Sequence, residues 1–548
     1  MQRKETLFNM LITWYPSDIY KRMFSMSIMA PVNCELISLI RSKVCDRKML
    51  LRTVISLNLL PCLALLFSVV QSEEFSIALK RQLLIYHEPP FENIGPKHNN
   101  VTEHFITQKL DNFDHQNKKT FQMRYLKNDR HFQSGGPVFI YIGGEWEISS
   151  GAISSGQYIY DLAEEFRGLL IYTEHRYYGQ TMPTETVSTE NLKYLTIEQS
   201  LADLAHFIEE ITSDKQLNAT GGVIIVGASY SATMAAWFRQ KYPHLVKGAW
   251  ASSAPLQAKL NYFEYTETVG ESIRKIGGKK CHDKIEKSFQ LIEDLLNRND
   301  FKMLQKLFKI CDTFNTTNKY DVWNFVSSLK DMFSSIVQGH EPGSIEYYCK
   351  ILTKNTTNQT DDIEGHDLYP FVQVYRKFFR PNRNTSCISL DYESDVKELK
   401  KDNTSLAFNF RPWFYQTCSE FGWYQTTDSK NHPFGKLSAI EFYLHLCKDV
   451  FGDVFEDATV LEDNVQHTNV LYGGFNPAVT NVYFSHGSLD PWHPMGILED
   501  LNVHSPAAVI SGISHCRDLD SINYKHDTKQ LIESKITVRN LVKKWLKY

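Results

Sequence analysis

The stretch from Gly222 to Trp237, which reads GVIIVGASYSATMAAW, decides the fold of this chain. It begins with a run of β-branched residues, continues through small residues to Ser229, and passes directly into a segment whose apolar positions recur at three and four residues. This pattern predicts a strand, a tight turn and a helix. The serine therefore stands where a strand gives way to a helix.

The residues around Ser229 suit a nucleophile elbow, the sharp turn that presents a serine hydroxyl at the top of the sheet in an α/β-hydrolase. Small residues are needed because the strand and helix backbones pass close together, and Gly227 and Ala228 meet that need. After the serine, the usual G-x-S-x-G pattern has a second glycine, whereas this chain has Ser231 followed by Ala232. The motif is degenerate, and further residues must support it.

Strands and helices alternate on both sides of the elbow, which predicts a parallel-rich sheet covered on both faces. We expect strands at 120–126, 137–142, 169–172, 246–251, 482–484 and 507–510, and helices at 197–211 and 528–546. From residue 261 to 436 the pattern changes to amphipathic helices, which predicts a helical cap inserted into the core. The expected fold is an α/β-hydrolase core, residues 73–260 and 437–548, interrupted by this cap.

An apolar window from Leu50 to Val70, preceded by basic residues and followed by small ones near Ser72, is typical of a secretory signal peptide. Its position predicts that translation starts at Met49 and that residues 1–72 form a leader. A signal anchor is the alternative, because the window nearly reaches the length that spans a bilayer. Pro61 and the small residues favour cleavage, so we expect no stable membrane span in the mature chain.

Several features of the remaining chain are typical of secreted or lysosomal glycoproteins. None of the seven cysteines after the leader falls in a C-x-x-C pair, which disfavours a metal site and allows three disulfides with one thiol left over. The small formal charge of −4 and the lack of a basic block disfavour nucleic acid as a partner. Seven N-glycosylation sequons are present, at Asn100, Asn218, Asn315, Asn355, Asn358, Asn384 and Asn403.

A serine nucleophile needs a histidine as general base and a carboxylate that orients the histidine. Asp490 follows the predicted strand at 482–484, and His515 follows the predicted strand at 507–510. The order Ser229, Asp490, His515 is that of the α/β-hydrolases. We predict these three residues as the catalytic triad. The backbone amides of Tyr230 and of Gly144 or Glu145, in a glycine loop after an earlier strand, are the predicted oxyanion-hole donors.

Four stretches carry a family resemblance: Gly143–Trp146, Glu174–Gly179, Gly227–Tyr230 and Ser488–Trp492. Together they resemble the serine carboxypeptidase family that includes lysosomal Pro-X carboxypeptidase, dipeptidyl peptidase II and thymus-specific serine protease. Two further stretches, Trp413–Thr426 and Ser514–Cys516, are most similar to the thymus-specific branch. The resemblance covers nearly everything from Gln108 onward. Departures from the family pattern occur at Ala228, Ser231 and Ala232 in the elbow and at His486, where the family usually has asparagine.

The resemblance implies a peptidase with a disulfide-bonded cap that acts on peptides, with no cofactor or metal, in the secretory pathway or the lysosome. Family members with assigned substrates cut next to proline, so a preference for proline-containing peptides is one expectation. Trp146, Glu420 and Trp492 are candidates for the substrate pocket. Two alternatives stay open: a catalytically impaired glycoprotein that uses the fold for binding, because of the altered elbow, and an esterase. A homodimer is one assembly that the sequence allows.

Overall fold

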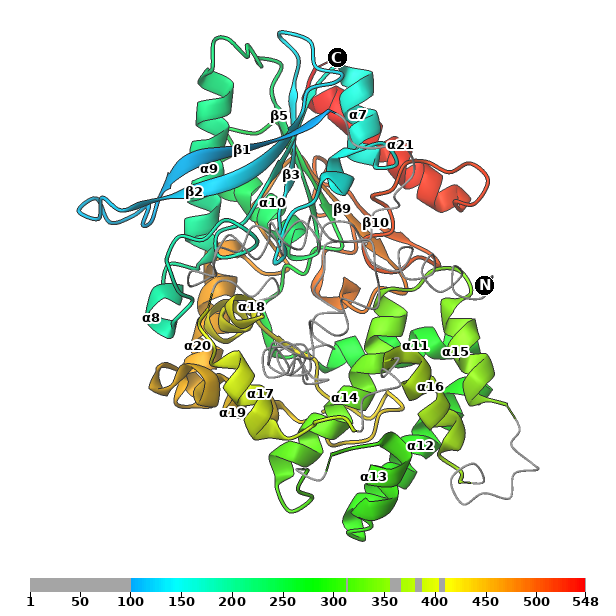
Figure 1. Ribbon diagram of the computed structural model, residues 1–548. Helices are drawn as coiled ribbons and strands as arrows, with labels where there is room; N and C mark the ends of the chain where they lie inside the picture. Colours follow the sequence, from blue (N-terminus) through cyan, green and yellow to red (C-terminus); the bar gives the residue numbers. More distant parts are fainter. Residues whose placement is uncertain (1–99, 312–313, 355–365, 380–386, 404–409, 548) are drawn as a thin grey trace, which may run out of the picture. The chain divides into compact units, whose positions relative to one another are not determined.

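The protein contains an eight-stranded sheet with the strand order β1-β2-β4-β3-β5-β6-β9-β10. Its computed structural model describes residues 100–311, 314–354, 366–379, 387–403 and 410–547 (Figure 1), so the leader predicted at 1–72 lies outside the described residues. Strands β1 and β2 pair in antiparallel fashion, β2 is antiparallel to β4, and all further pairings in the sheet are parallel. The strands are β1 (Val101–Lys109), β2 (Thr120–Asn128), β3 (Val138–Ile142), β4 (Leu169–Thr173), β5 (Val223–Ala228), β6 (Gly248–Ser252), β9 (Val482–Gly487) and β10 (Ala507–Ile510).

Both faces of the central strands are buried, because neighbouring side chains of a strand point to opposite faces. In β3, Val138 and Ile140 pack into one hydrophobic core with helices α9 and α10, whereas Phe139 and Tyr141 pack into a second core with α7 and α21 (Figure 1). The helices of the core are α7 (Tyr158–Phe166), α8 (Thr189–Leu192), α9 (Ile197–Ser213), α10 (Tyr230–Lys241) and α21 (Lys529–Trp545). The sequence-based expectation of a parallel-rich sheet covered on both faces is confirmed.

A long helical insertion separates β6 from β9. It carries the short parallel pair β7 (Lys259–Asn261) and β8 (Gly422–Tyr424), and its last helices, α19 and α20, follow residue 436. The sheet resumes only at Val482. The helices of the insertion are α11 (Phe263–Gly277), α12 (Lys279–Asn297), α13 (Phe301–Phe308), α14 (Lys319–Gln338), α15 (Ser344–Leu352), α16 (Tyr369–Phe379), α17 (Tyr392–Leu399), α18 (Arg411–Gln416), the π-turn η2 (Thr417–Phe421), α19 (Ile440–Phe451) and α20 (Ala458–Tyr472).

Three disulfides join elements of the insertion. They are Cys281–Cys349, Cys311–Cys387 and Cys418–Cys447, and they leave Cys516 as a buried free thiol. The expectation of three disulfides and one unpaired cysteine is confirmed.

The insertion contacts the loops that follow β9 and β10. The hydroxyl of Ser514 donates to the carbonyl of Val337 at 2.6 Å, at the end of α14, and the indole N–H of Trp492 donates to Gln338 at 2.9 Å. From the start of α11, the hydroxyl of Tyr262 donates to the carbonyl of Pro491 at 2.6 Å. The insertion is therefore a cap that packs on the same edge of the sheet as the predicted Asp490 and His515.

Strand β1 was not among the predicted elements. It is an edge strand on which most side chains are exposed or half-buried, so its sequence lacks the apolar alternation that marks a half-buried strand. Across the described ranges, no helix combines the length and apolar character that crossing a membrane requires.

Candidate active site

Ser229 lies between β5 and α10 in the strained backbone of a nucleophile elbow. Its φ is 56° and its ψ is −127°, a region that residues with a side chain rarely adopt. Its amide donates to the carbonyl of Ser252 at 3.0 Å, which ties the turn to the neighbouring strand. A Cβ at Gly227 would lie 2.2 Å from the carbonyl oxygen of Ser231. Only glycine fits at this position.

Ser231 and Ala232, the departures from the usual elbow, are fully buried. The Ser231 hydroxyl accepts a hydrogen bond from the amide of Ala228 and donates one to the carbonyl of Ala228, both at 2.9 Å. This hydroxyl therefore bonds inside the turn, and the elbow keeps its shape with serine in place of glycine.

Asp490 and His515 meet beyond the ends of β9 and β10. The Nδ1 of His515 donates to the Oδ1 of Asp490 at 2.9 Å, and Asp490 also accepts the amide of Trp492 at 2.9 Å. Burial lowers the pKa of His515, but the charge of Asp490 and the hydrogen bond outweigh burial and hold that pKa well above its usual value. Burial likewise raises the pKa of Asp490, and the charge of His515 overrides it, so the carboxylate pKa lies below its ordinary value.

The sheet places Ser229 on the same edge as this pair. Strands β5, β6, β9 and β10 are consecutive and parallel, and Ser229, Asp490 and His515 each follow the carboxyl end of one of them. Within the described residues, the Ser229 hydroxyl makes no hydrogen bond to His515. Catalytic hydrogen bonds are often long in a free enzyme and shorten when substrate binds.

Ser253 connects the strand beside the elbow to the turn that carries His515. Its hydroxyl accepts the amide of Cys516 at 3.0 Å, and its hydrogen bond to Asp490 helps to lower the pKa of that carboxylate. Like Ser229, Ser253 has a positive φ, at 55°. The sequence analysis did not single out Ser253, and only its position directly after a predicted strand could have suggested it.

The glycine loop after β3 contributes amides near the elbow. The amide of Gly143 is used in the sheet, where it donates to Thr173 at 2.8 Å. The backbone N–H of Glu145 donates to the carboxylate of the same residue. The amides of Gly144 and Tyr230 donate no hydrogen bond to any described residue. Tyr230 is the first residue of α10, and the first amides of a helix have no partner within the helix.

Glu145 and Glu420 are buried carboxyl groups without a cationic partner among the described residues. Burial raises the pKa of Glu145 to about 7 and that of Glu420 to about 8. One oxygen of Glu145 is buried and has no hydrogen-bond partner among the residues that the structure describes. Both oxygens of Glu420 accept hydrogen bonds, from the amide of Ile197 at 2.9 Å and from Gln416 at 3.3 Å. Glu420 therefore also caps the start of α9.

A continuous series of buried aromatic rings connects Tyr230 of the elbow to His515. The ring of Trp492 lies 6.5 Å from that of His515 and 5.7 Å from that of Trp423, centroid to centroid. Trp423 stacks on Phe421 at 4.5 Å, and Phe421 lies 5.4 Å from Tyr230. We call Phe421, Trp423 and Trp492 the aromatic wall. Trp492 was predicted as a pocket residue, whereas Phe421 and Trp423 lie within a quoted motif but were not assigned a role.

The side chain of Trp146 is held by a hydrogen bond and by its contact with Gly144. The indole N–H of Trp146 donates to the hydroxyl of Tyr172 at 2.7 Å, and the Trp146 ring lies where a Cβ at Gly144 would be, at 2.6 Å. Trp146 thus restricts position 144 to glycine.

Four of the sequon asparagines are exposed, namely Asn100, Asn218, Asn315 and Asn403. The other three, Asn355, Asn358 and Asn384, lie outside the described residues.

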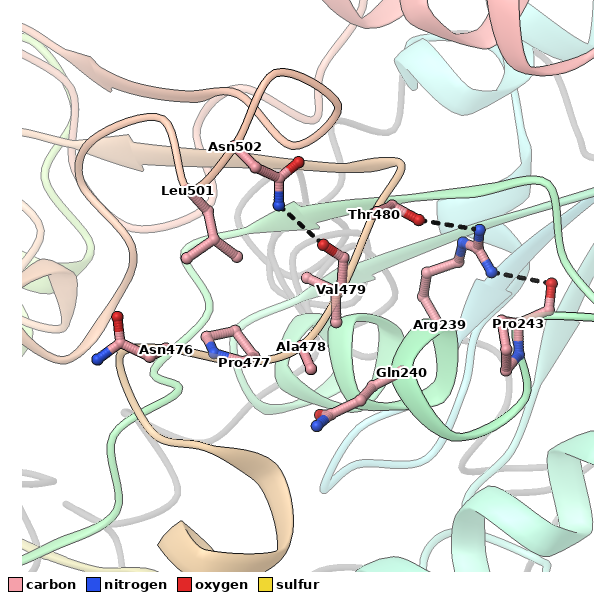
Figure 2. Close-up of a pocket in the computed structure, with 10 residues that line it drawn as sticks. All are labelled: Arg239, Gln240, Pro243, Asn476, Pro477, Ala478, Val479, Thr480, Leu501 and Asn502. Atoms are coloured by element: carbon pink, nitrogen blue, oxygen red, sulfur yellow. Dashed lines mark hydrogen bonds between the residues drawn. The ribbon is translucent and has the colours of Figure 1, made fainter.

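A separate surface pocket of about 320 Å³ lies near the carboxyl-terminal end of α10 (Figure 2). There the guanidinium of Arg239 donates to the carbonyl of Pro243 at 2.8 Å, and the amide of Asn502 donates to Val479 at 2.9 Å. Because Arg239 and Gln240 of the pocket lie 10 and 11 positions after Ser229 along α10, the pocket lies about 15–17 Å from the elbow along the helix axis. It is not part of the site around Ser229.

The sheet order, the cap and the elbow define the class of this protein, which is an α/β-hydrolase. Residues 108–538 match the serine carboxypeptidase S28 family. The chain belongs to this family, and it is a serine peptidase.

Relatives of known name span most of the chain. Thymus-specific serine protease of Mus musculus is 31% identical over 454 residues, which cover 81% of this chain and 87% of that protein. Lysosomal Pro-X carboxypeptidase of Homo sapiens is 28% identical over 461 residues, 81% of this chain and 88% of that protein. Among solved structures, a proline iminopeptidase from Mycobacterium smegmatis is similar with a TM-score of 0.32 and 10% identity, covering 80% of this chain and 99% of that one.

Proposed function

We propose that this chain is a serine exopeptidase in which Ser229 is the nucleophile, His515 the general base and Asp490 the carboxylate that orients the base. The observation that carries this proposal is the strained elbow at Ser229 on the same sheet edge as the His515–Asp490 hydrogen bond of 2.9 Å. The Nδ1 of His515 donates to Asp490, so its Nε2 is the nitrogen that takes the proton of Ser229. The matching family and the named relatives support peptide bonds as the target.

In the proposed reaction, the Ser229 Oγ attacks the carbonyl carbon of the scissile peptide while His515 takes the hydroxyl proton. The oxyanion that forms accepts hydrogen bonds from the amides of Tyr230 and Gly144. His515 then gives the proton to the leaving amine, the C–N bond breaks, and an acyl-enzyme remains. Water, deprotonated by His515, releases the second product and restores Ser229.

We further propose that the aromatic wall binds an apolar residue next to the scissile bond and that proline suits it. Flat aromatic faces offer a rigid apolar surface, and the compact ring of proline presents a matching flat face. The name of the Pro-X carboxypeptidase relative points the same way. Glu145 is the candidate to contact a polar end of the peptide, because one of its buried carboxyl oxygens has no partner within the described ranges.

The proposed setting is the secretory pathway or the lysosome. Three disulfides persist only where thiols are oxidised, and the exposed sequon asparagines are accessible to glycosylation. Mass spectrometry of the protein from a secreting cell, before and after removal of N-glycans, tests both statements.

Labelling with a fluorophosphonate probe tests the nucleophile. We expect the wild-type protein to be labelled, the Ser229→Ala variant to be unlabelled and the control variant Ser231→Ala to be labelled. Labelling that persists in Ser229→Ala would exclude Ser229 as the nucleophile. A digest of a peptide library between pH ~4 and ~8 then tests the substrate, because product masses show which terminus is recognised and whether proline is required. Turnover of no peptide would favour the alternative of a binding protein.

A further inference from the structure

The hydroxyl of Tyr230 belongs to a network of hydrogen bonds between buried side chains. Its hydroxyl lies 2.9 Å from the Nε2 of Gln416 and 3.1 Å from the Nε2 of His175. The hydroxyl of Tyr178 lies 2.7 Å from the Oε1 of Gln416. All four side chains are buried, with Gln416 and Tyr230 at most 1% exposed. We call Tyr178, Gln416, Tyr230 and His175 the elbow network.

The hydrogen bonds of the elbow network have one consistent direction. The Nδ1 of His175 lies 2.8 Å from the carbonyl of Arg176, which only accepts, so Nδ1 carries the proton. Burial lowers the pKa of His175 to about 3, so its ring is neutral and its Nε2 accepts from the Tyr230 hydroxyl. The Tyr230 oxygen accepts from the amide of Gln416, and the Gln416 carbonyl accepts from Tyr178. These assignments follow from the network itself.

The network joins two parts of the chain that meet only in the folded state. Tyr178 and His175 follow β4 in the core, whereas Gln416 is the last residue of cap helix α18. Gln416 also donates to Glu420 of the π-turn η2 at 3.3 Å, and Glu420 accepts the amide of Ile197 at the start of α9. The cap is therefore fastened to the core at the residue directly after Ser229.

The position of the Tyr230 ring determines the position of the Tyr230 amide. The ring is packed on Trp413 at 5.3 Å and on Phe421 at 5.4 Å, both from the cap, and its hydroxyl is fixed by two hydrogen bonds. The amide of Tyr230 is the proposed oxyanion donor at the other end of the same residue. A side chain fixed at both its ring and its hydroxyl leaves the first turn of α10 little freedom to rotate.

We propose that Gln416 is a positioning residue, which holds the Tyr230 hydroxyl and thereby keeps the Tyr230 amide aimed at the oxyanion of the transition state. This inference rests on the proposed function. By this inference the cap takes part in catalysis as well as lining the substrate site, because the junction of α18 and η2 sets the geometry of the elbow.

The inference predicts a loss in kcat rather than in substrate binding, because an oxyanion donor acts on charge that develops only in the transition state. A misplacement of about 1 Å can cost about 100-fold in rate, so we expect a smaller shift of the amide to cost about 10-fold. Tyr230→Phe removes only the hydroxyl and keeps the ring and the amide. We expect kcat about 10-fold lower, with KM within about twofold of wild type, in both Tyr230→Phe and Gln416→Leu.

The experiment compares kcat and KM of Tyr230→Phe, Gln416→Leu and the double variant, each per active site counted with the fluorophosphonate probe. The double variant should be no slower than the slower single variant, because both substitutions break the same hydrogen bond. Tyr415→Phe is the matched control, since Tyr415 is the neighbour of Gln416 in α18 and its hydroxyl bonds to none of the described residues. We expect Tyr415→Phe to keep the wild-type kcat.

Two outcomes would overturn the inference alone. An unchanged kcat per active site in Tyr230→Phe would do so even if Gln416→Leu does not fold. Losses that multiply in the double variant would show that the two side chains act independently. A wild-type protein that the probe does not label would overturn the proposed function and this inference with it. The labelling of the wild-type protein therefore distinguishes the two failures before any variant is measured.

Discussion

His486 is a buried histidine near the end of β9, and its replacement should change how the stability of the protein depends on pH. It is 1% exposed, and neither ring nitrogen has a hydrogen-bond partner in the part of the chain that the structure describes. Burial, aided by the charges of His493 and His515 and opposed by that of Asp490, lowers the pKa of His486 to about 4. The ring fills the space where a Cβ at Gly496 would be, 2.1 Å from its Cε1, so it cannot shift there to find a partner.

The sign of the effect follows from comparing the folded and unfolded chains. Above pH ~6.5 the ring is neutral in both states. As the pH falls from ~6.5 toward ~4, the unfolded chain binds a proton that the folded chain does not, so the folded state loses about 1.4 kcal/mol per pH unit. At pH ~5 the loss is about 2 kcal/mol relative to pH ~8. His486→Asn removes the titrating ring and therefore this part of the acid sensitivity.

Urea unfolding at pH ~8 and pH ~5, with the disulfides intact, measures the effect as a difference of differences. The loss of unfolding free energy between the two pH values should be about 2 kcal/mol smaller in His486→Asn than in wild type. Any cost of burying an asparagine applies at both pH values and cancels. His504→Asn, a substitution of the same kind at an exposed histidine, is the control. An equal loss in wild type and in His486→Asn would refute the reasoning.

Three further predictions concern the elbow, the acid of the pair and the cap. Gly227→Ala places a Cβ against the Ser231 carbonyl, so we expect little or no folded protein, which the yield of secreted protein measures. Asp490→Asn should lower kcat by about 10⁴-fold. It should also move the acid limb of the kcat/KM profile to lower pH, because Asp490 raises the pKa of His515. A pH–rate profile in which the acid limb does not move would contradict this prediction. Replacing both Cys418 and Cys447 by serine should lower the free energy of unfolding by about 3 kcal/mol, measured by urea unfolding, because the bridge closes a loop of 29 residues.

The core and the proposed triad could be predicted from the sequence because the patterns that indicate them lie within short stretches of the chain. Each of Ser229, Asp490 and His515 lies within a few residues of the end of a short apolar run, and the carboxyl ends of neighbouring parallel strands share one edge of a sheet. The order of the strands then brings together residues that are far apart in the chain. The family motifs strengthened the interpretation, and the match over residues 108–538 confirmed the family.

The contacts between cap and core could not be predicted in this way. Gln416 reaches Tyr230 only because α18 docks on the elbow, and its surrounding sequence has no period or spacing that predicts this contact. The disulfide pairing could not be predicted from the sequence either, because the spacing of cysteines does not determine which of them pair. The role of His175 in fixing the direction of the elbow network could not be predicted either, because it depends on the carbonyl of Arg176 and on the Tyr230 hydroxyl.

The insertion of the cap between β6 and β9 has a consequence for biosynthesis. Ala249 pairs with Val482, so the half of the sheet that carries Ser229 must wait for the entire cap to be synthesised before it acquires the strands leading to Asp490 and His515. Pairings of such high contact order form late and slowly. If the proposed triad is correct, a nascent chain holds Ser229 before its proposed base His515 has been synthesised, so we expect peptidase activity only when synthesis is nearly complete.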